Sequence, residues 1–161
     1  MSGDIADLPA IVDLAHKYNA RVMVDDSHGI GTIGEGGRGT ASYYGLEDQV
    51  DIIMGTFSKS FASLGGFAAA SEIVIDYMRH MSRPFIFSAS MTPSSCATAT
   101  AALEHLVEHP ELKDQLSAVA TWLRDALKER GVRYKETQTP IVPIYNHPYN
   151  LLKNCVYLQL E

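Results

Sequence analysis

VDDSHGIGTIGEGGRG (residues 24–39) and GTFSKSFASLGG (residues 55–66) are the two stretches from which the architecture of this chain follows. A short run of β-branched and apolar residues leads into each, at Arg21–Val24 and at Asp51–Met54. Such runs are typical of strands buried in a parallel sheet, and open α/β sheets bind ligands at the carboxyl ends of their strands. Because polar residues follow both runs directly, we expect a site at that edge.

Helical and strand patterns alternate on both sides of these stretches. We expect helices at Asp4–Asn19, Glu72–Met81, Pro93–Glu108 and Glu111–Arg130, a polar loop over residues 29–50, and further strands at Gly65–Ala70, Phe85–Phe87 and Pro140–Tyr145. This order predicts an α/β fold, a mainly parallel sheet with helices on both faces. A change of domain is expected near residue 135, which would divide the chain into residues 1–135 and 136–161.

Composition narrows the classes of protein. The 161 residues are 46% hydrophobic and 20% charged, with a net charge of -6, which favours a globular chain with one core over a disordered one. No apolar run is long enough for a membrane span and no secretion signal opens the chain, so we expect a cytoplasmic protein. Scattered basic residues and a net negative charge argue against a nucleic-acid partner. Cys96 and Cys155 lack metal-site spacing, and we expect no metal.

Two patterns imitate nucleotide-binding motifs. Gly29, Gly31 and Gly34 have the spacing G-x-G-x-x-G, but more glycines follow at the point where a dinucleotide site needs a helix. Lys59 with Ser60 resembles the end of a P-loop, but a serine precedes this lysine where that motif requires glycine. We therefore reject a P-loop and keep a NAD-binding half-domain only as a lesser alternative.

Asp25 and Lys59 each follow a predicted buried strand, so both can reach one crevice of a parallel sheet. A lysine among apolar neighbours such as Phe57 and Phe61 is costly to bury unless its amine is used, and a desolvated amine is the nucleophile of Schiff-base chemistry. Pyridoxal 5'-phosphate needs such a lysine, an acid for its pyridine nitrogen and donors for its phosphate.

The same stretches contain the other groups that this cofactor requires. Asp25 is the candidate acid, His28 a candidate partner for the ring phenol oxygen or a substrate group, and the Thr56 and Ser58 hydroxyls candidate phosphate donors. Each residue alone also has an ordinary interpretation, as a turn residue or a solvated loop side chain. The joint placement of Asp25, His28 and Lys59 favours the functional hypothesis. By contrast, we expect surface or ion-paired positions for Arg38, His16, His80, His105 and His109.

At these residues the chain resembles the α-oxoamine synthases, pyridoxal-phosphate enzymes of fold type I. Residues 24–39 are similar to the block of that family that contains Asp and His, residues 55–66 to its lysine block, and SRPFIFSASMTP (residues 82–93) to the segment that crosses the dimer interface. The resemblance covers about residues 3–145. It implies that the chain forms the central part of the large cofactor-binding domain and the start of an incomplete small domain.

The resemblance also implies roles for individual residues. Lys59 would be catalytic, carrying the cofactor and then removing the substrate α-proton, and His28 would assist at the phenol oxygen. Asp25 would pair with the pyridine nitrogen, and Thr56 and Ser58 would hold the phosphate. Phe87 and Ser88 would contact the cofactor of the other subunit in a homodimer.

The reaction implied is a decarboxylative condensation of an amino acid with an acyl-CoA. SFASLGGF (residues 60–67) and RPFIFSAS (residues 83–90) are most similar to family members that join serine to palmitoyl-CoA, and next to those that join glycine to acetyl-CoA. Joining alanine to a pimeloyl thioester is a further alternative.

The chain also departs from the family pattern. Family members are more than twice as long, and neither their ring-stacking residue nor the arginine that binds the substrate carboxylate can be located here. From Asn146 onward the resemblance ends. We therefore expect a fragment without synthase activity of its own and with weak cofactor binding at most. The non-enzymatic alternative is a truncated core that folds or dimerises without cofactor.

Overall fold

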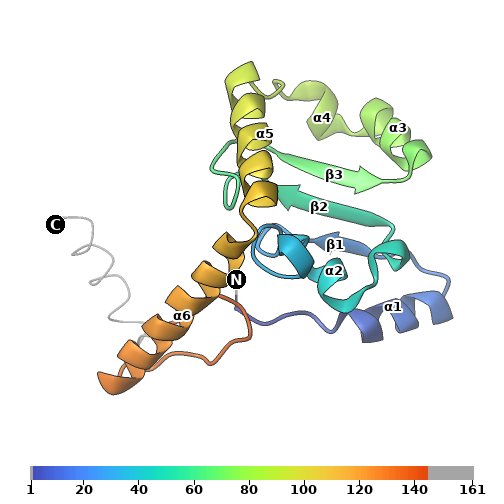
Figure 1. Cartoon of the computed structure of the whole chain (residues 1–161). Coiled ribbons are helices and arrows are strands. Elements are labelled where there is room, and N and C mark those ends of the chain that lie inside the picture. Colours follow the sequence, from blue (N-terminus) through green and yellow to red (C-terminus); the bar gives the residue numbers. More distant parts are fainter. Residues whose placement is uncertain (1, 145–161) are drawn as a thin grey trace, which may run out of the picture. The chain divides into compact units, whose positions relative to one another are not determined.

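The computed structural model describes residues 2–144, which form two compact units, residues 5–114 and residues 2–4 with 115–144. The larger unit contains a three-stranded sheet of order β1-β2-β3, formed by Met23–Asp25, Ile52–Thr56 and Gly66–Ala70. Strands β1 and β2 are parallel, with Met23 opposite Ile52 and Asp25 opposite Met54. Their arrowheads point the same way in Figure 1, toward the helix α5 (Pro93–Glu108).

The sheet is mixed, which corrects the expected mainly parallel arrangement. Strand β3 runs antiparallel to β2, pairing from Ile52 with Ala70 to Thr56 with Gly66. The connection over residues 57–65 explains this direction, since a parallel crossover needs a dozen or more residues. The two ends of this loop are joined by a hydrogen bond, in which the Phe57 amide donates to the Gly65 carbonyl at 2.9 Å.

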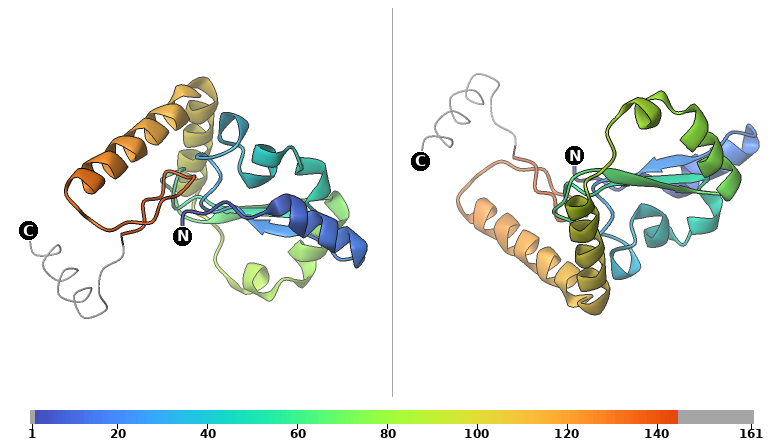
Figure 2. Two further views of the ribbon diagram at one scale, coloured as in Figure 1. Left: turned by 90° about the horizontal axis from the view of Figure 1, so that it is seen from below. Right: turned by 90° about the horizontal axis from the view of Figure 1, so that it is seen from above.

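Helices cover both faces of this sheet, as expected (Figure 2). On one side lie α2 (Thr40–Tyr44) and α5, and on the other α3 (Glu72–Met81) and α4 (Arg83–Phe87). The helix α1 (Leu8–Lys17) buries Leu8 and Val12 against Val22 of the segment before β1 and Ala41 of α2. This small cluster is the core that fixes β1, and therefore the start of the first glycine-rich stretch.

Several boundaries differ from the sequence prediction for local reasons. Helix α1 begins after Asp7 rather than Asp4, because the Asp7 carboxylate accepts the Ala10 amide at 3.3 Å and caps it. The predicted loop over residues 29–50 contains α2 and the short 3-10 helices Glu35–Gly37 and Glu47–Gln49.

Two predicted strands are wrong. Residues Phe85–Phe87 belong to α4, where Pro84 lies in the first turn and suits the helical φ angle. The described part of Pro140–Tyr145 forms only an isolated bridge between Tyr134 and Ile144. Its prolines lack the N–H groups that a strand ladder requires.

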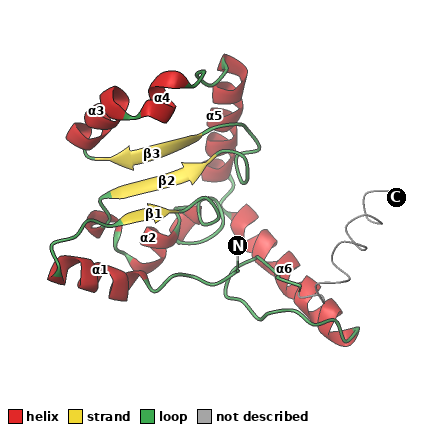
Figure 3. Cartoon of the chain, turned by 180° about the vertical axis from the view of Figure 1, so that it is seen from behind, coloured by secondary structure: helices red, strands yellow, loops and turns green. Residues whose placement is uncertain are grey.

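The helix α6 (Glu111–Glu129) is the main element of the smaller unit, and the other predicted helices match α3 and α5 closely (Figure 3). Within this unit Lys135 pairs with Asp4, and the Thr139 hydroxyl donates to the Gly3 carbonyl at 2.9 Å. No helix among residues 2–144 is long and apolar enough to cross a membrane. The change of domain expected near residue 135 stays a prediction, and Cys155 and residues 146–161 lie outside the described part.

Candidate active site

The carboxyl ends of β1 and β2 lie side by side, as the sequence predicted. Asp25 is the last residue of β1 and Thr56 the last residue of β2, with Lys59 on the turn that follows. Because the two strands are parallel and adjacent, the polar residues after both meet at one edge of the sheet.

Asp25 is exposed, and its carboxylate is engaged by its own turn. Oδ1 accepts the Ser27 amide at 3.1 Å and the Ser27 hydroxyl at 2.5 Å. These hydrogen bonds hold the pKa of the Asp25 carboxyl below its usual range, and the nearby charges of Lys59 and His28 lower it further. Asp25 is thus a turn residue, the ordinary interpretation, and also an anion placed beside Lys59.

His28 lies within reach of the Lys59 charge. Partial burial lowers the pKa of His28, the Lys59 charge lowers it further, and the Asp25 carboxylate opposes both. Asp25, His28 and Lys59 therefore share one electrostatic neighbourhood. The expectation of a buried lysine is wrong for the structure described, since Lys59 is exposed on the turn after β2.

Thr56 and Ser58 bring two hydroxyls together beside the lysine. Their oxygens are 2.8 Å apart, and the Ser58 amide donates to the Thr56 hydroxyl at 3.2 Å. Ser58 also lines an open depression of about 460 Å³ with Ser94, Ser95 and Thr98 at the start of α5. This cluster of hydroxyls has the donor chemistry that a phosphate requires.

Phe87 and Ser88 lie at the end of α4, and both are exposed. Phe87 is 83% exposed, which is unusual for a residue with a phenyl ring. Their expected contact with the cofactor of a partner subunit stays a prediction.

Asp26, the neighbour of Asp25, is a residue whose role the sequence analysis missed. It is 3% exposed, and its Oδ2 and Oδ1 accept the Thr40 amide at 2.6 Å and the Thr40 hydroxyl at 2.7 Å. Alternation along a strand gives the signal that could have found it, because adjacent residues face opposite sides of a sheet.

The glycines of residues 29–39 are explained by Asp26 and by Ser60. A Cβ on Gly29 or Gly39 would overlap the Asp26 carboxylate, and Gly39 has a φ of +99°. A Cβ on Gly31 would come within 2.6 Å of the Ser60 Cβ. The glycines therefore serve close packing and backbone conformation, not a dinucleotide, and Arg38 is exposed and paired with Glu47 at 3.7 Å.

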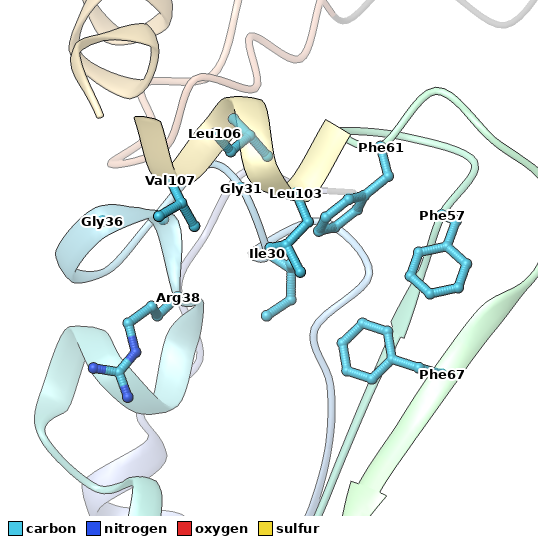
Figure 4. Close-up of a pocket in the computed structure, with 11 residues that line it drawn as sticks. Ile30, Gly31, Gly36, Arg38, Phe57, Phe61, Phe67, Leu103, Leu106 and Val107 are labelled. Atoms are coloured by element: carbon cyan, nitrogen blue, oxygen red, sulfur yellow. The ribbon is translucent and has the colours of Figure 1, made fainter. Parts of the chain in front are cut away.

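Asp25 is not among the residues that line an apolar pocket of about 420 Å³ in this unit. Figure 4 shows the side chains that do line it. The phenyl rings of Phe57, Phe61 and Phe67 line it together with Ile30 and residues of α5, while the Arg38 guanidinium points away from those rings. Phe67 pairs with Gly55 in the sheet, so its side chain is on the face opposite to that of Met54 and Asp25. We interpret this pocket as packing space behind the candidate site.

Comparison with known proteins adds an independent observation. The family model described as aminotransferase class I and II matches residues 1–157. The chain belongs to the aminotransferase class I and II family. A serine palmitoyltransferase of Sphingobacterium spiritivorum is 50% identical over 90% of this chain and 36% of its own length. An 8-amino-7-oxononanoate synthase of Petrotoga mobilis is 46% identical over 89% of this chain and 37% of its own length.

Solved structures place this family member beside the same relatives. A serine palmitoyltransferase from S. paucimobilis with bound PLP-myriocin aldimine superposes with a TM-score of 0.84, at 39% identity, covering 91% of this chain and 39% of that one. The resemblance to the α-oxoamine synthases is thereby confirmed. This aminotransferase-family chain spans 36–37% of the length of the curated relatives named above.

Proposed function

We propose that this chain provides the cofactor-binding centre of a pyridoxal-phosphate-dependent acyltransferase of the serine palmitoyltransferase type. The observation that carries the proposal is the meeting of Asp25, His28 and Lys59 beyond two adjacent parallel strands. The 50% identity with a serine palmitoyltransferase supports the choice of reaction.

The residues present fit the chemistry of the cofactor. An ionised carboxylate, a lysine amine and paired hydroxyls are the three kinds of group that pyridoxal phosphate requires. Asp25 supplies the first, because its pKa is lowered and it is anionic at neutral pH. Lys59 supplies the second, and Thr56 with Ser58 the third.

Each side chain then has one task. Asp25 keeps a proton on the pyridine nitrogen, which the nearby negative charge stabilises. His28 donates to the phenol oxygen, and the Lys59 Nζ holds the cofactor and later takes the proton from the substrate α-carbon. When bound, the group supplies withdrawal of electrons from that carbon.

The substrates and the assembly follow from the same proposal. Serine or glycine condenses with an acyl-CoA, releasing carbon dioxide and CoA, and the protein acts as a homodimer with a shared active site. Phe87 and Ser88, exposed at the end of α4, reach the cofactor of the partner subunit. Residues 1–135 belong to the large domain and residues 136–161 begin the small one.

Cofactor addition tests the lysine assignment directly. The purified chain is mixed with pyridoxal phosphate, the yellow adduct is measured by absorbance, and borohydride then fixes the cofactor for peptide mapping. We expect the label on the peptide that contains Lys59 and its loss in Lys59→Ala. Lys128→Ala, at an exposed lysine of α6, is the control that retains it. A label on any other peptide shows that the assignment is wrong.

Two alternatives are distinguished by the adduct together with a second measurement, the change in its absorbance on adding serine, glycine or alanine. A related acyltransferase, such as an 8-amino-7-oxononanoate synthase or a 2-amino-3-ketobutyrate CoA ligase, gives the same adduct at Lys59 but a different amino-acid preference. A core that folds or dimerises without cofactor gives no yellow adduct at all.

A further inference from the structure

The buried Asp26 carboxylate joins two segments that are distant in sequence. It accepts both the amide and the hydroxyl of Thr40, the first residue of α2, fourteen positions along the chain. A carboxylate is costly to bury, and hydrogen bonds to the charged form offset that cost. Within residues 2–144 the hydrogen-bond donors to this carboxylate are the amide and the hydroxyl of Thr40. The connection between Asp26 and Thr40 is therefore specific.

Asp26 begins the turn that carries His28 and is hydrogen-bonded to the residues that end it. The Asp26 carbonyl accepts the Gly29 amide at 2.9 Å and the Ile30 amide at 3.0 Å, so that His28 lies inside a closed loop. Gly29 packs so closely on the carboxylate that a side chain there would overlap it. Moving the carboxylate therefore moves the backbone on which His28 is carried.

The same turn is tied to the lysine. The Ser60 hydroxyl donates to the Ile30 carbonyl at 2.7 Å, and Ser60 is adjacent to Lys59. Gly31 also packs closely on the Ser60 side chain, since a Cβ on Gly31 would come within 2.6 Å of the Ser60 Cβ. A continuous set of contacts thus runs from Thr40 through Asp26 and Ile30 to Ser60, defining a frame of four residues.

We propose that Asp26 is a positioning residue that, through this frame, sets the placement of His28 relative to Lys59. Asp26 touches neither cofactor nor substrate in this role. The inference rests on the proposed function, because the placement matters only if both residues act on one ligand.

Thr40 offers a graded test that spares Asp26 itself. Thr40→Val keeps the shape but removes the hydroxyl that donates to Oδ1, whereas Thr40→Ser keeps that hydroxyl. Thr100→Val is the matched control, since the exposed Thr100 hydroxyl donates to a backbone carbonyl of α5 at 3.0 Å. The apparent dissociation constant of pyridoxal phosphate is measured from the borohydride-fixed label at Lys59. We expect Thr40→Val to weaken binding by about tenfold and the other two variants to leave it unchanged.

A double-mutant cycle distinguishes positioning from general loss of stability. Thr40→Val and Ser60→Ala break the frame at opposite ends, so the double variant should bind little more weakly than the worse single one. Effects that multiply would show independent structural losses and would overturn the proposal. Equal binding by Thr40→Val and Thr40→Ser would overturn it as well.

Amide hydrogen exchange keeps the two proposals separable. If the unaltered chain forms no adduct, the proposed function fails, and the same cycle is measured on the exchange rates of Gly29 and Ile30. Faster exchange at these amides in both single variants, with the β2–β3 ladder unchanged, supports the frame. Unchanged exchange at Gly29 in Thr40→Val refutes it without reference to cofactor.

Discussion

Asp25 and Asp26 are neighbours in the chain with opposite environments. Asp25 is exposed and bonded to its own turn, whereas Asp26 is 3% exposed and bonded to the distant Thr40. The alternation of a strand separates them onto two sides of the sheet edge. The two aspartates thus have different roles. Asp25 faces the candidate site, and Asp26 holds the backbone next to it.

The largest difference in stability is expected between the alanine variants of the two aspartates. Asp26→Ala leaves the Thr40 amide and hydroxyl buried without an acceptor and should lower the free energy of unfolding by about 4 kcal/mol. Asp25→Ala removes an exposed side chain and should change it by about 0.5 kcal/mol or less. Urea denaturation of both variants measures the contrast, and equal losses would contradict the division of roles.

A methyl group placed against the buried carboxylate sharpens the comparison. Gly39→Ala combines a φ of +99° with overlap of Asp26 Oδ2, and should cost about 2–3 kcal/mol of unfolding free energy. Gly36→Ala meets no atom within 4 Å at a φ of +56°, and should cost about 1 kcal/mol. Thermal denaturation compares the two glycines directly. A larger effect at Gly36 would mean that backbone conformation alone explains the loop.

A substitution at Ser60 tests the contact between the turn that carries His28 and the turn that carries Lys59. Ser60→Ala removes the hydrogen bond to the Ile30 carbonyl and should reduce the free energy of unfolding by about 1 kcal/mol. Ser58→Ala, at an exposed hydroxyl of the same turn, provides the control, and its stability in urea should be nearly unchanged. If Ser58→Ala proved the more damaging variant, the bond from Ser60 would not be the one that holds the turn.

The smallest effects are expected in the titration of His28. Its pKa lies below the ordinary 6.5 because of burial and the Lys59 charge, while Asp25 raises it. Lys59→Met should therefore raise the His28 pKa, and Asp25→Asn should lower it further. NMR titration of the ring Cε1–H measures both, and shifts in the same direction would show that the three groups do not share one neighbourhood.

The lowered pKa of His28 also makes the stability of the fold depend on pH. The fold favours the neutral ring, so the contribution of this group is fully present above its unfolded pKa and is lost as the pH falls through its folded pKa. Replacing His28 with Gln should flatten that part of the pH profile of unfolding.

Much of the fold could be predicted because its elements have strong local signals. The apolar runs before Asp25 and Gly55 gave β1 and β2, and long periodic patterns gave α3, α5 and α6. The prediction of short elements failed where local sequence signals conflict. The residues Phe85–Phe87 fit a strand by composition, but the proline before them sits in a helical first turn.

The candidate site could be predicted only in its exposed half. Asp25, His28 and Lys59 follow strands, and that position is readable from the chain itself. The bond between Asp26 and Thr40 depends on how a glycine-rich loop folds back over fourteen residues, which no local pattern specifies. The burial expected for Lys59 failed for a related reason, since the exposure of a turn is set by what packs over it in three dimensions.

The register of β1 against β2 fixes the distance between Asp25 and Thr56. Asp25 is opposite Met54, so Thr56 lies two residues farther along the neighbouring strand. At the usual rise and spacing of strands, the two Cα atoms are about 8 Å apart. A slip of one residue would turn Asp25 to the other face of the sheet. In the proposed function, the hydrogen bonds of these two short strands would therefore set the distance between the acid at one end of the cofactor ring and the hydroxyl at the other.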